Sequence, residues 1–158
     1  MPKYCIPFEA VATAAVAGTE KTIAEVINAN TSGHRCRLLE IAVGPADAAP
    51  LDYNLGLSLQ RDNAGAAAAS GTGTAVTPAP LDNDAVACVQ TAKKNLSAEP
   101  TYDDELWRIE MNGRSTLVQQ WAPEDAPVCQ QDQLIGLVAE PRSANAHTIS
   151  GHIIFENF

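Results

Sequence analysis

The sequence is poor in aromatic residues and in positive charge, and it contains no long hydrophobic run. Only 5% of its 158 residues are aromatic, so the core must be built mainly from Leu, Ile and Val. Lys and Arg number 10 against 19 Asp and Glu, and the net charge of -9 disfavours binding to nucleic-acid phosphates or to anionic membranes. No stretch approaches the roughly 18 apolar residues of a membrane span. A chain of this length is expected to form a single domain over residues 1–158.

The sequence also lacks the motifs of common catalytic and cofactor sites. It has no Gly-Lys-Ser/Thr phosphate loop and no Gly-x-Ser-x-Gly elbow. No Cys-x-x-Cys pair or His-x-His pair offers zinc-ligand spacing, and acidic clusters such as Asp82-Asn83-Asp84 lack the spacing of a calcium loop, which favours solvated turns. We therefore expect no enzyme activity, no catalytic, metal or cofactor-binding residue, and a function that resides in surfaces.

The cysteines are few and widely separated. They are Cys5, Cys36, Cys88 and Cys129. Reduced thiols that act as small core hydrophobes are favoured over two disulfides, because the export signal is unconvincing. The alternative is an exported protein in which Ala15-Val16-Ala17 is a signal-peptidase site, but Pro7 and Glu9 interrupt the apolar region. A first β-strand within residues 1–18 is the better interpretation.

Alternation with a period of two dominates the rest of the chain. In "YNLGLSLQR" the side chains of Tyr53, Leu55, Leu57 and Leu59 alternate with small or polar residues, as in a strand with one buried face. In "HRCRLLEIAVG" the alternation changes phase between Leu38 and Leu39, as a β-bulge would cause. Further strands are predicted in residues 104–112, 115–121, 132–140 and 147–158, with Asn112-Gly113 as a hairpin signal.

Two segments depart from this pattern. "KTIAEVINAN" spaces Ile23, Val26 and Ile27 as on one helix face, which predicts one short helix. Residues 63–80 carry no charge and few bulky side chains, which predicts a long small-residue loop. The expected fold is therefore all-β: a jelly-roll-like antiparallel β-sandwich with one short helix and this extended loop.

Four blocks of the sequence together resemble small jelly-roll virion proteins that decorate or cement the capsids of tailed bacteriophages. The blocks are "EKTIAEVINANTSGHRCRLLEIAVG", "GTGTAVTPAPLD", "TAKKNLSAEPTYDDELWRIEMN" and "QLIGLVAEPRSANAHTISGHIIFEN". The resemblance covers nearly the whole chain from Lys21 onward. It implies a homo-oligomer, often a trimer, that is made in the host cytoplasm and binds the major capsid protein on the outside of the virion.

The extended loop is the expected contact region, because small side chains allow close backbone approach and lose little entropy on docking. The predicted partner-contact residues are Ala66, Thr72, Thr74, Val76, Thr77, Pro78 and Pro80. Two alternatives remain open: a tail, fibre or head-spike component of the virion, and a carbohydrate-binding jelly-roll module. The latter would need exposed aromatic rings, and Tyr53 and Trp107 fall on predicted strands where core packing is favoured.

Overall fold

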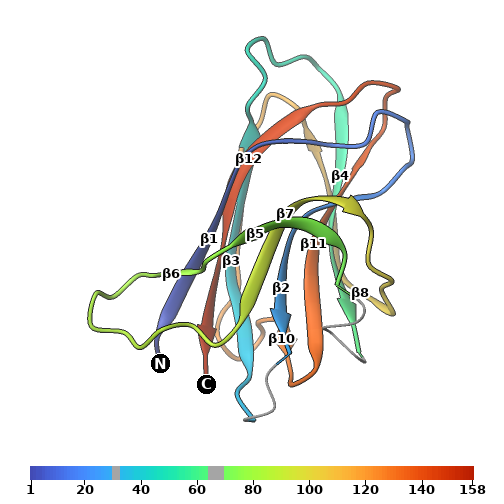
Figure 1. Ribbon diagram of the computed structural model, residues 1–158. Helices are drawn as coiled ribbons and strands as arrows, with labels where there is room; N and C mark the ends of the chain where they lie inside the picture. The colour runs from blue at the N-terminus through green and yellow to red at the C-terminus, as the bar shows by residue number, and fades with distance from the viewer. Residues whose placement is uncertain (30–32, 64–69) are drawn as a thin grey trace.

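Two antiparallel sheets pack face to face as a β-sandwich in the computed structural model, which describes residues 1–29, 33–63 and 70–158 (Figure 1). Sheet A has the order β10-β3-β12-β1-β6, and β9 also pairs with β3. Sheet B has the order β5-β7-β2-β11-β4-β8. The strands are β1 (Lys3–Ala12), β2 (Lys21–Asn28), β3 (Cys36–Pro45), β4 (Asn54–Asp62), β5 (Thr72–Val76), β6 (Ala79–Pro80), β7 (Thr91–Ala98), β8 (Asp104–Asn112), β9 (Leu117–Gln120), β10 (Val128–Cys129), β11 (Gln133–Pro141) and β12 (Thr148–Asn157).

The strand order is that of a jelly roll. Sheet A contains β1, β12, β3 and β9 side by side, and sheet B contains β2, β11, β4 and β8 side by side. The chain therefore passes repeatedly from one sheet to the other, as in two interleaved Greek keys. The predicted jelly-roll-like sandwich is confirmed.

The aliphatic residues singled out by alternation fill the space between the sheets. Leu55, Leu57 and Leu59 of β4 are fully buried in the core cluster. In β3 the register against β12 skips one residue, Leu39, between Leu38 and Glu40. This bulge brings residues before and after it onto the same inner face, so that the predicted change of phase is confirmed.

The predicted helix in residues 21–30 is wrong, because residues 21–28 form strand β2. Every residue from Thr22 to Asn28 is buried. Both faces of β2 are covered and both carry apolar residues, so its sequence loses the period of two and imitates a helix face. Val26 packs in the main core, whereas Ile27 packs with Leu134 and Tyr102 in a second, smaller cluster.

Asn112-Gly113 does not form the predicted hairpin, because β8 and β9 belong to different sheets. The Gly113 amide donates a hydrogen bond to the Tyr53 carbonyl at 2.8 Å. A Cβ atom at Gly113 would lie 2.2 Å from the Tyr53 ring. The glycine therefore serves close packing at a crossover between the sheets rather than a two-residue turn.

An insertion between β4 and β8, residues 63–103, extends both sheets at the side remote from β4. It adds β7 and β5 beside β2 in sheet B, and it adds β6 beside β1 in sheet A. The predicted loop at residues 63–80 is therefore wrong for residues 72–76 and 79–80, which are strands. Pairing with the later strand β7 orders residues 72–76, and local sequence does not encode that pairing.

The returning chain of the insertion crosses the outer face of sheet B. The Glu99 carboxylate accepts a hydrogen bond from the Thr22 amide at 2.7 Å, and the Asp103 amide donates to the Arg61 carbonyl at 2.9 Å. Between these two points Tyr102 lies directly over Gly136 of β11. A Cβ atom at Gly136 would lie 1.9 Å from the Tyr102 hydroxyl, so only glycine allows this crossing.

We predict that Gly136→Ala destabilises the protein by about 1–3 kcal/mol, because the added methyl group must displace the Tyr102 ring. Urea denaturation measures the free energy of unfolding. In the Tyr102→Ala background the same change should cost little, since all three nearest heavy atoms to the added Cβ belong to Tyr102. An equal cost in both backgrounds would contradict this assignment.

Candidate functional site

The segment between β6 and β7, residues 81–90, extends past the β1–β6 edge of the sandwich, and we refer to it as the arm (Figure 1). It carries large apolar side chains in solvent: Leu81 is 55% exposed, Val86 73% and Val89 45%. Scattered single apolar residues are normal on a protein surface, but a cluster on one projecting segment indicates a binding surface.

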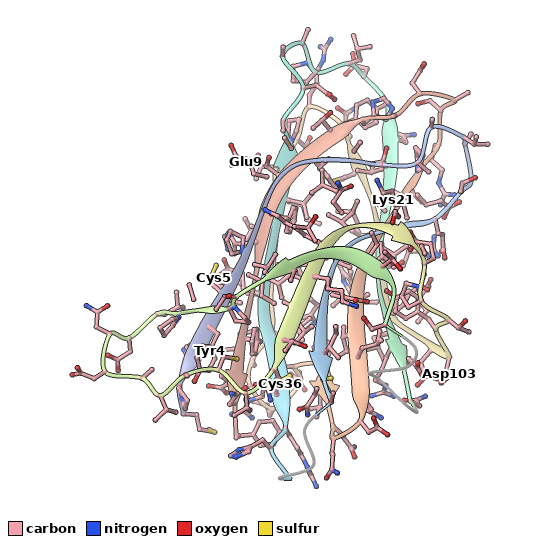
Figure 2. All side chains as sticks on the ribbon, in the orientation of Figure 1. Tyr4, Cys5, Glu9, Lys21, Cys36 and Asp103 are labelled. Carbon is pink, nitrogen blue, oxygen red and sulfur yellow. The ribbon has the colours of Figure 1, made fainter. Side chains whose placement is uncertain are left out.

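Hydrogen bonds to the body of the sandwich hold the arm in place. The Leu81 amide donates to the Lys3 carbonyl at 2.9 Å, and the buried Tyr4 hydroxyl donates to the Val86 carbonyl at 2.7 Å. Tyr4 lies at the end of the sandwich that carries both chain termini (Figure 2). The backbone of the arm is thus fixed while its apolar side chains stay exposed, so that little ordering is needed before a partner binds.

A largely apolar hollow of about 580 Å³ lies between the arm and the β5–β6 connection. Four predicted contact residues, Val76, Thr77, Pro78 and Pro80, line it together with arm residues such as Ala85 and Ala87. Pro78 itself is buried, so it forms part of the wall rather than an exposed contact.

Two other predicted contact residues, Thr72 and Thr74, are exposed on β5 outside the hollow, and Ala66 lies outside the described residues. The structure thus brings most of the predicted contact region to one side of the sandwich. Whether these residues contact a partner stays a prediction.

A second hollow, of about 320 Å³, lies where the arm returns past the chain termini. Met1, Val86, Val89 and Phe158 line it, and Ala87 belongs to both hollows. The two hollows therefore flank the arm and form one continuous surface with it. Sequence reasoning missed the arm because Asp82 and Asp84 suggested a solvated turn, although the apolar residues of "AVACV" directly follow them.

The free edge of sheet B at β5 adjoins this surface. Within the described part of the chain, strand β5 pairs with β7 alone, and its sequence, Thr-Gly-Thr-Ala-Val, has no charged residue. Edge strands are usually protected by charge, proline or shortness. At the other edges β8 carries four charged residues, β6 and β10 have two residues each, and β9 has four. We define the arm surface as β5, residues 77–80 and the arm.

A buried carboxylate anchors the chain where it enters β5. The Ser70 hydroxyl donates to Glu25 at 2.8 Å, and the Lys93 ammonium lies 3.9 Å from the same carboxylate. Lys93 also donates to the Gly71 carbonyl at 2.8 Å. Glu25 is fully buried, and burial raises the pKa of this carboxyl group above its ordinary value, against the opposing effects of Ser70 and Lys93. The anchor fixes β5 to β2 and so positions the arm surface.

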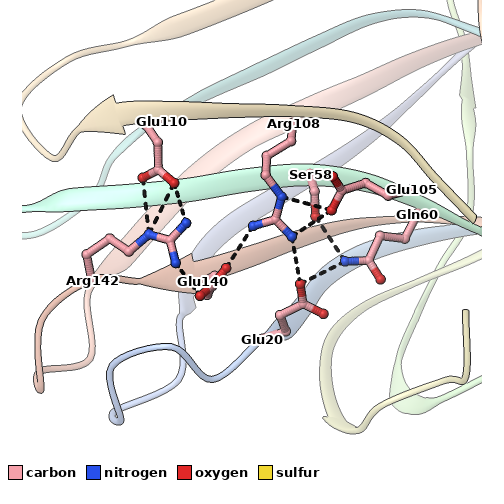
Figure 3. Close-up of polar contacts among 8 residues, drawn as sticks. All are labelled: Glu20, Ser58, Gln60, Glu105, Arg108, Glu110, Glu140 and Arg142. Atoms are coloured by element: carbon pink, nitrogen blue, oxygen red, sulfur yellow. Dashed lines mark hydrogen bonds and ion pairs between the residues drawn. The ribbon is translucent and has the colours of Figure 1, made fainter.

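Charged side chains cover the outer face of sheet B over β4 and β8 (Figure 3). Arg108 lies between carboxylates, at 3.0 Å from Glu20 and 2.8 Å from Glu140. Arg142 pairs with Glu110 and with Glu140. These charged side chains form ion pairs with one another and remain in contact with water. This face is therefore a poor site for an apolar partner, and the arm surface is the better candidate.

The described residues contain no group of three or more His, Cys, Asp or Glu side chains that could hold a metal ion. His147 is buried and stacks on Tyr53, and His152 pairs with Glu40 at 2.7 Å on the central strand β12. No helix in the described part of the chain is long and apolar enough to cross a membrane. No protein-family model matches the chain, and the search of curated proteins finds no similar one.

We predict that Glu25→Gln changes the pH dependence of stability. Folding raises the pKa of this carboxyl group, so its stabilising contribution is present below the ordinary pKa of 4.5 and is lost as the pH rises through the folded-state pKa. The free energy of unfolding of the parent, relative to that of Glu25→Gln, should fall as the pH rises above 4.5. Urea denaturation across this range measures it, with the exposed Glu9→Gln as control. The same pH dependence in the parent and in Glu25→Gln would contradict the raised pKa that burial gives this carboxyl group.

Proposed function

We propose that the protein is a structural virion protein that decorates the outside of a tailed-bacteriophage capsid and clamps neighbouring subunits of the major capsid protein. The observation that carries the proposal is the arm surface, in which a jelly-roll body presents fixed, exposed apolar side chains beside an uncharged sheet edge. Because the sequence blocks resemble capsid decoration proteins, we propose the major capsid protein as the partner that binds this surface. The proposal assigns no catalytic step to the protein.

The same surface supports self-association into a homo-oligomer, with a trimer expected from the resemblance. Each aliphatic side chain that becomes fully buried contributes about 1.5–3 kcal/mol. Leu81, Val86 and Val89 are all available for such burial. On a capsid, lattice symmetry brings many copies together, so that modest contacts add through effective concentration.

The net charge of -9 agrees with a position on the outer surface, because an acidic protein gains nothing from contact with packaged nucleic acid. The mechanism is stabilisation by mass action. A protein that binds only the assembled shell shifts the equilibrium away from disassembly, in the way that a ligand stabilises the state it binds.

The positions of the aromatic rings favour this proposal over a carbohydrate-binding module. Tyr4 and Tyr53 are buried, and Trp107 packs edge-on against Trp121 with ring centroids 6.0 Å apart. Rings that pack within the protein offer no flat platform for a sugar. A tail, fibre or head-spike position would use the same arm surface and is distinguished by the partner that binds it.

We predict that Val86→Asp dissociates the oligomer, because a charge in the apolar contact would be buried without a partner. Size-exclusion chromatography with light scattering measures the mass. The matched control is Val118→Asp, since Val118 is 55% exposed on β9 and belongs to neither hollow. A monomeric parent, or equal dissociation by both variants, would contradict self-association through the arm.

Binding to shells tests the virion function itself. We expect the parent protein to co-sediment with shells assembled from the major capsid protein encoded beside its gene, and we expect the Val86→Asp variant to bind at least tenfold more weakly if about 1.4 kcal/mol or more is lost. Val118→Asp should bind like the parent. If the parent protein does not co-sediment with the shells but binds tail or fibre proteins, the proposed position on the capsid is contradicted.

A further inference from the structure

The structure assigns a modification site that does not depend on the proposed function: we propose that Cys36 and Cys129 form a disulfide between β3 and β10 when the protein meets a small-molecule disulfide oxidant. The two residues are direct partners in the antiparallel register of these strands. Directly opposed residues have Cα atoms about 4.5–5.5 Å apart, which lies within the range of about 4.4–6.8 Å that disulfides span. The bond therefore needs no large movement of the backbone.

The surroundings of the pair favour it over other pairings. Cys36 and Cys129 are both fully buried, and Cys36 lies at the end of the sandwich that carries the termini (Figures 1 and 2). The Cys129 thiol donates to the Gln133 carbonyl at 3.3 Å. Among the described residues, Cys5 is half-buried on β1 opposite Ile154 and Ala79, and Cys88 is half-buried in the arm, where it is near enough to contribute to the raised pKa of Cys36 but is not its partner in a strand register.

Strand β10 is the part of the fold that such a bond would secure. It has only two residues, and it pairs with β3 only through Val128 and Cys129. Asn28 Nδ2 also donates to the neighbouring Gln130 carbonyl at 2.9 Å, but β10 lies at the edge of sheet A, where we expect opening to occur more readily than at the centre of the sheet. A covalent link between residues far apart in the sequence would remove much of the freedom of the unfolded chain and would hold this edge closed.

The chemistry balances as a thiol–disulfide exchange with oxidised glutathione. The thiolate of one cysteine attacks a glutathione sulfur, which breaks the glutathione disulfide, forms a mixed disulfide and releases one glutathione thiolate. The thiolate of the second cysteine then attacks the cysteine sulfur of the mixed disulfide, forms the Cys36–Cys129 bond and releases the second glutathione. The two cysteines lose two electrons to the oxidant, and their protons pass to the released thiolates through solvent.

Burial makes this exchange slow in the closed fold. The hydrogen bond between the two thiols and their burial raise the pKa of Cys36, so little thiolate is present at neutral pH. Oxidation therefore waits for opening of β10. We expect the pair to stay reduced in a reducing medium and to form the disulfide in an oxidising one.

The test incubates the full chain with excess oxidised glutathione at mildly alkaline pH, alkylates the remaining thiols under denaturing conditions, and maps the peptides by mass spectrometry. We expect one linked peptide pair, containing Cys36 and Cys129, with Cys5 and Cys88 alkylated or carrying glutathione. We also expect the oxidised protein to melt about 4–16 °C higher than the reduced protein. Alkylation of both Cys36 and Cys129 after oxidation, or a bond from either to Cys88, would overturn the proposal.

Substitutions separate the bond from general effects of oxidation. Cys129→Ala should abolish the rise in melting temperature caused by the oxidant, whereas Cys5→Ala, in the half-buried position on β1, should retain it. A rise that persists in Cys129→Ala would also overturn the proposal. If Cys129→Ala does not fold, the peptide map of the parent chain still decides the outcome.

Discussion

The packing of Tyr102 on Gly136 is the constraint on which the path of the insertion depends. Strand β11 lies in the middle of sheet B. The returning chain can cross its outer face because Gly136 has no side chain where Tyr102 packs. In sheet B, β7 lies beside β2 on one side of β11, and β8 lies beside β4 on the other side. The chain that joins β7 to β8 must therefore cross over β11. The Glu25 anchor then fixes the other end of the insertion, at the entry to β5.

The insertion gives one side of the sandwich a surface that is suited to binding another protein. At the opposite side, Trp107 from sheet B packs against Trp121 next to sheet A, and charged residues cover β8 and the face beside it. At the insertion side, the chain presents an uncharged edge strand and an arm with exposed Leu and Val side chains. This asymmetry supports the proposal that the protein binds its partners through the arm surface.

Sequence patterns predicted the parts of the fold that depend on neighbouring residues. The alternation of Leu55, Leu57 and Leu59 and the bulge at Leu39 were both readable, because each reflects large apolar residues on the core face opposite small or polar residues. Strand β2 was not, since apolar Ile27 on its outer face adds to Ile23 and Val26 in the main core and removes the alternation. Strand β5 was misread because its partner β7 comes from a distant part of the chain, and the arm was missed because Asp82 and Asp84 suggested a solvated turn.

Hydrogen–deuterium exchange of the protein, free and bound to assembled shells, tests the central claim most directly. The account predicts that binding slows exchange of the amides of β5 and the arm, because these backbone groups become covered, and leaves β8 and β9 unchanged. Slowed exchange that falls on β8 and β9, with β5 and the arm exchanging as in the free protein, would contradict it.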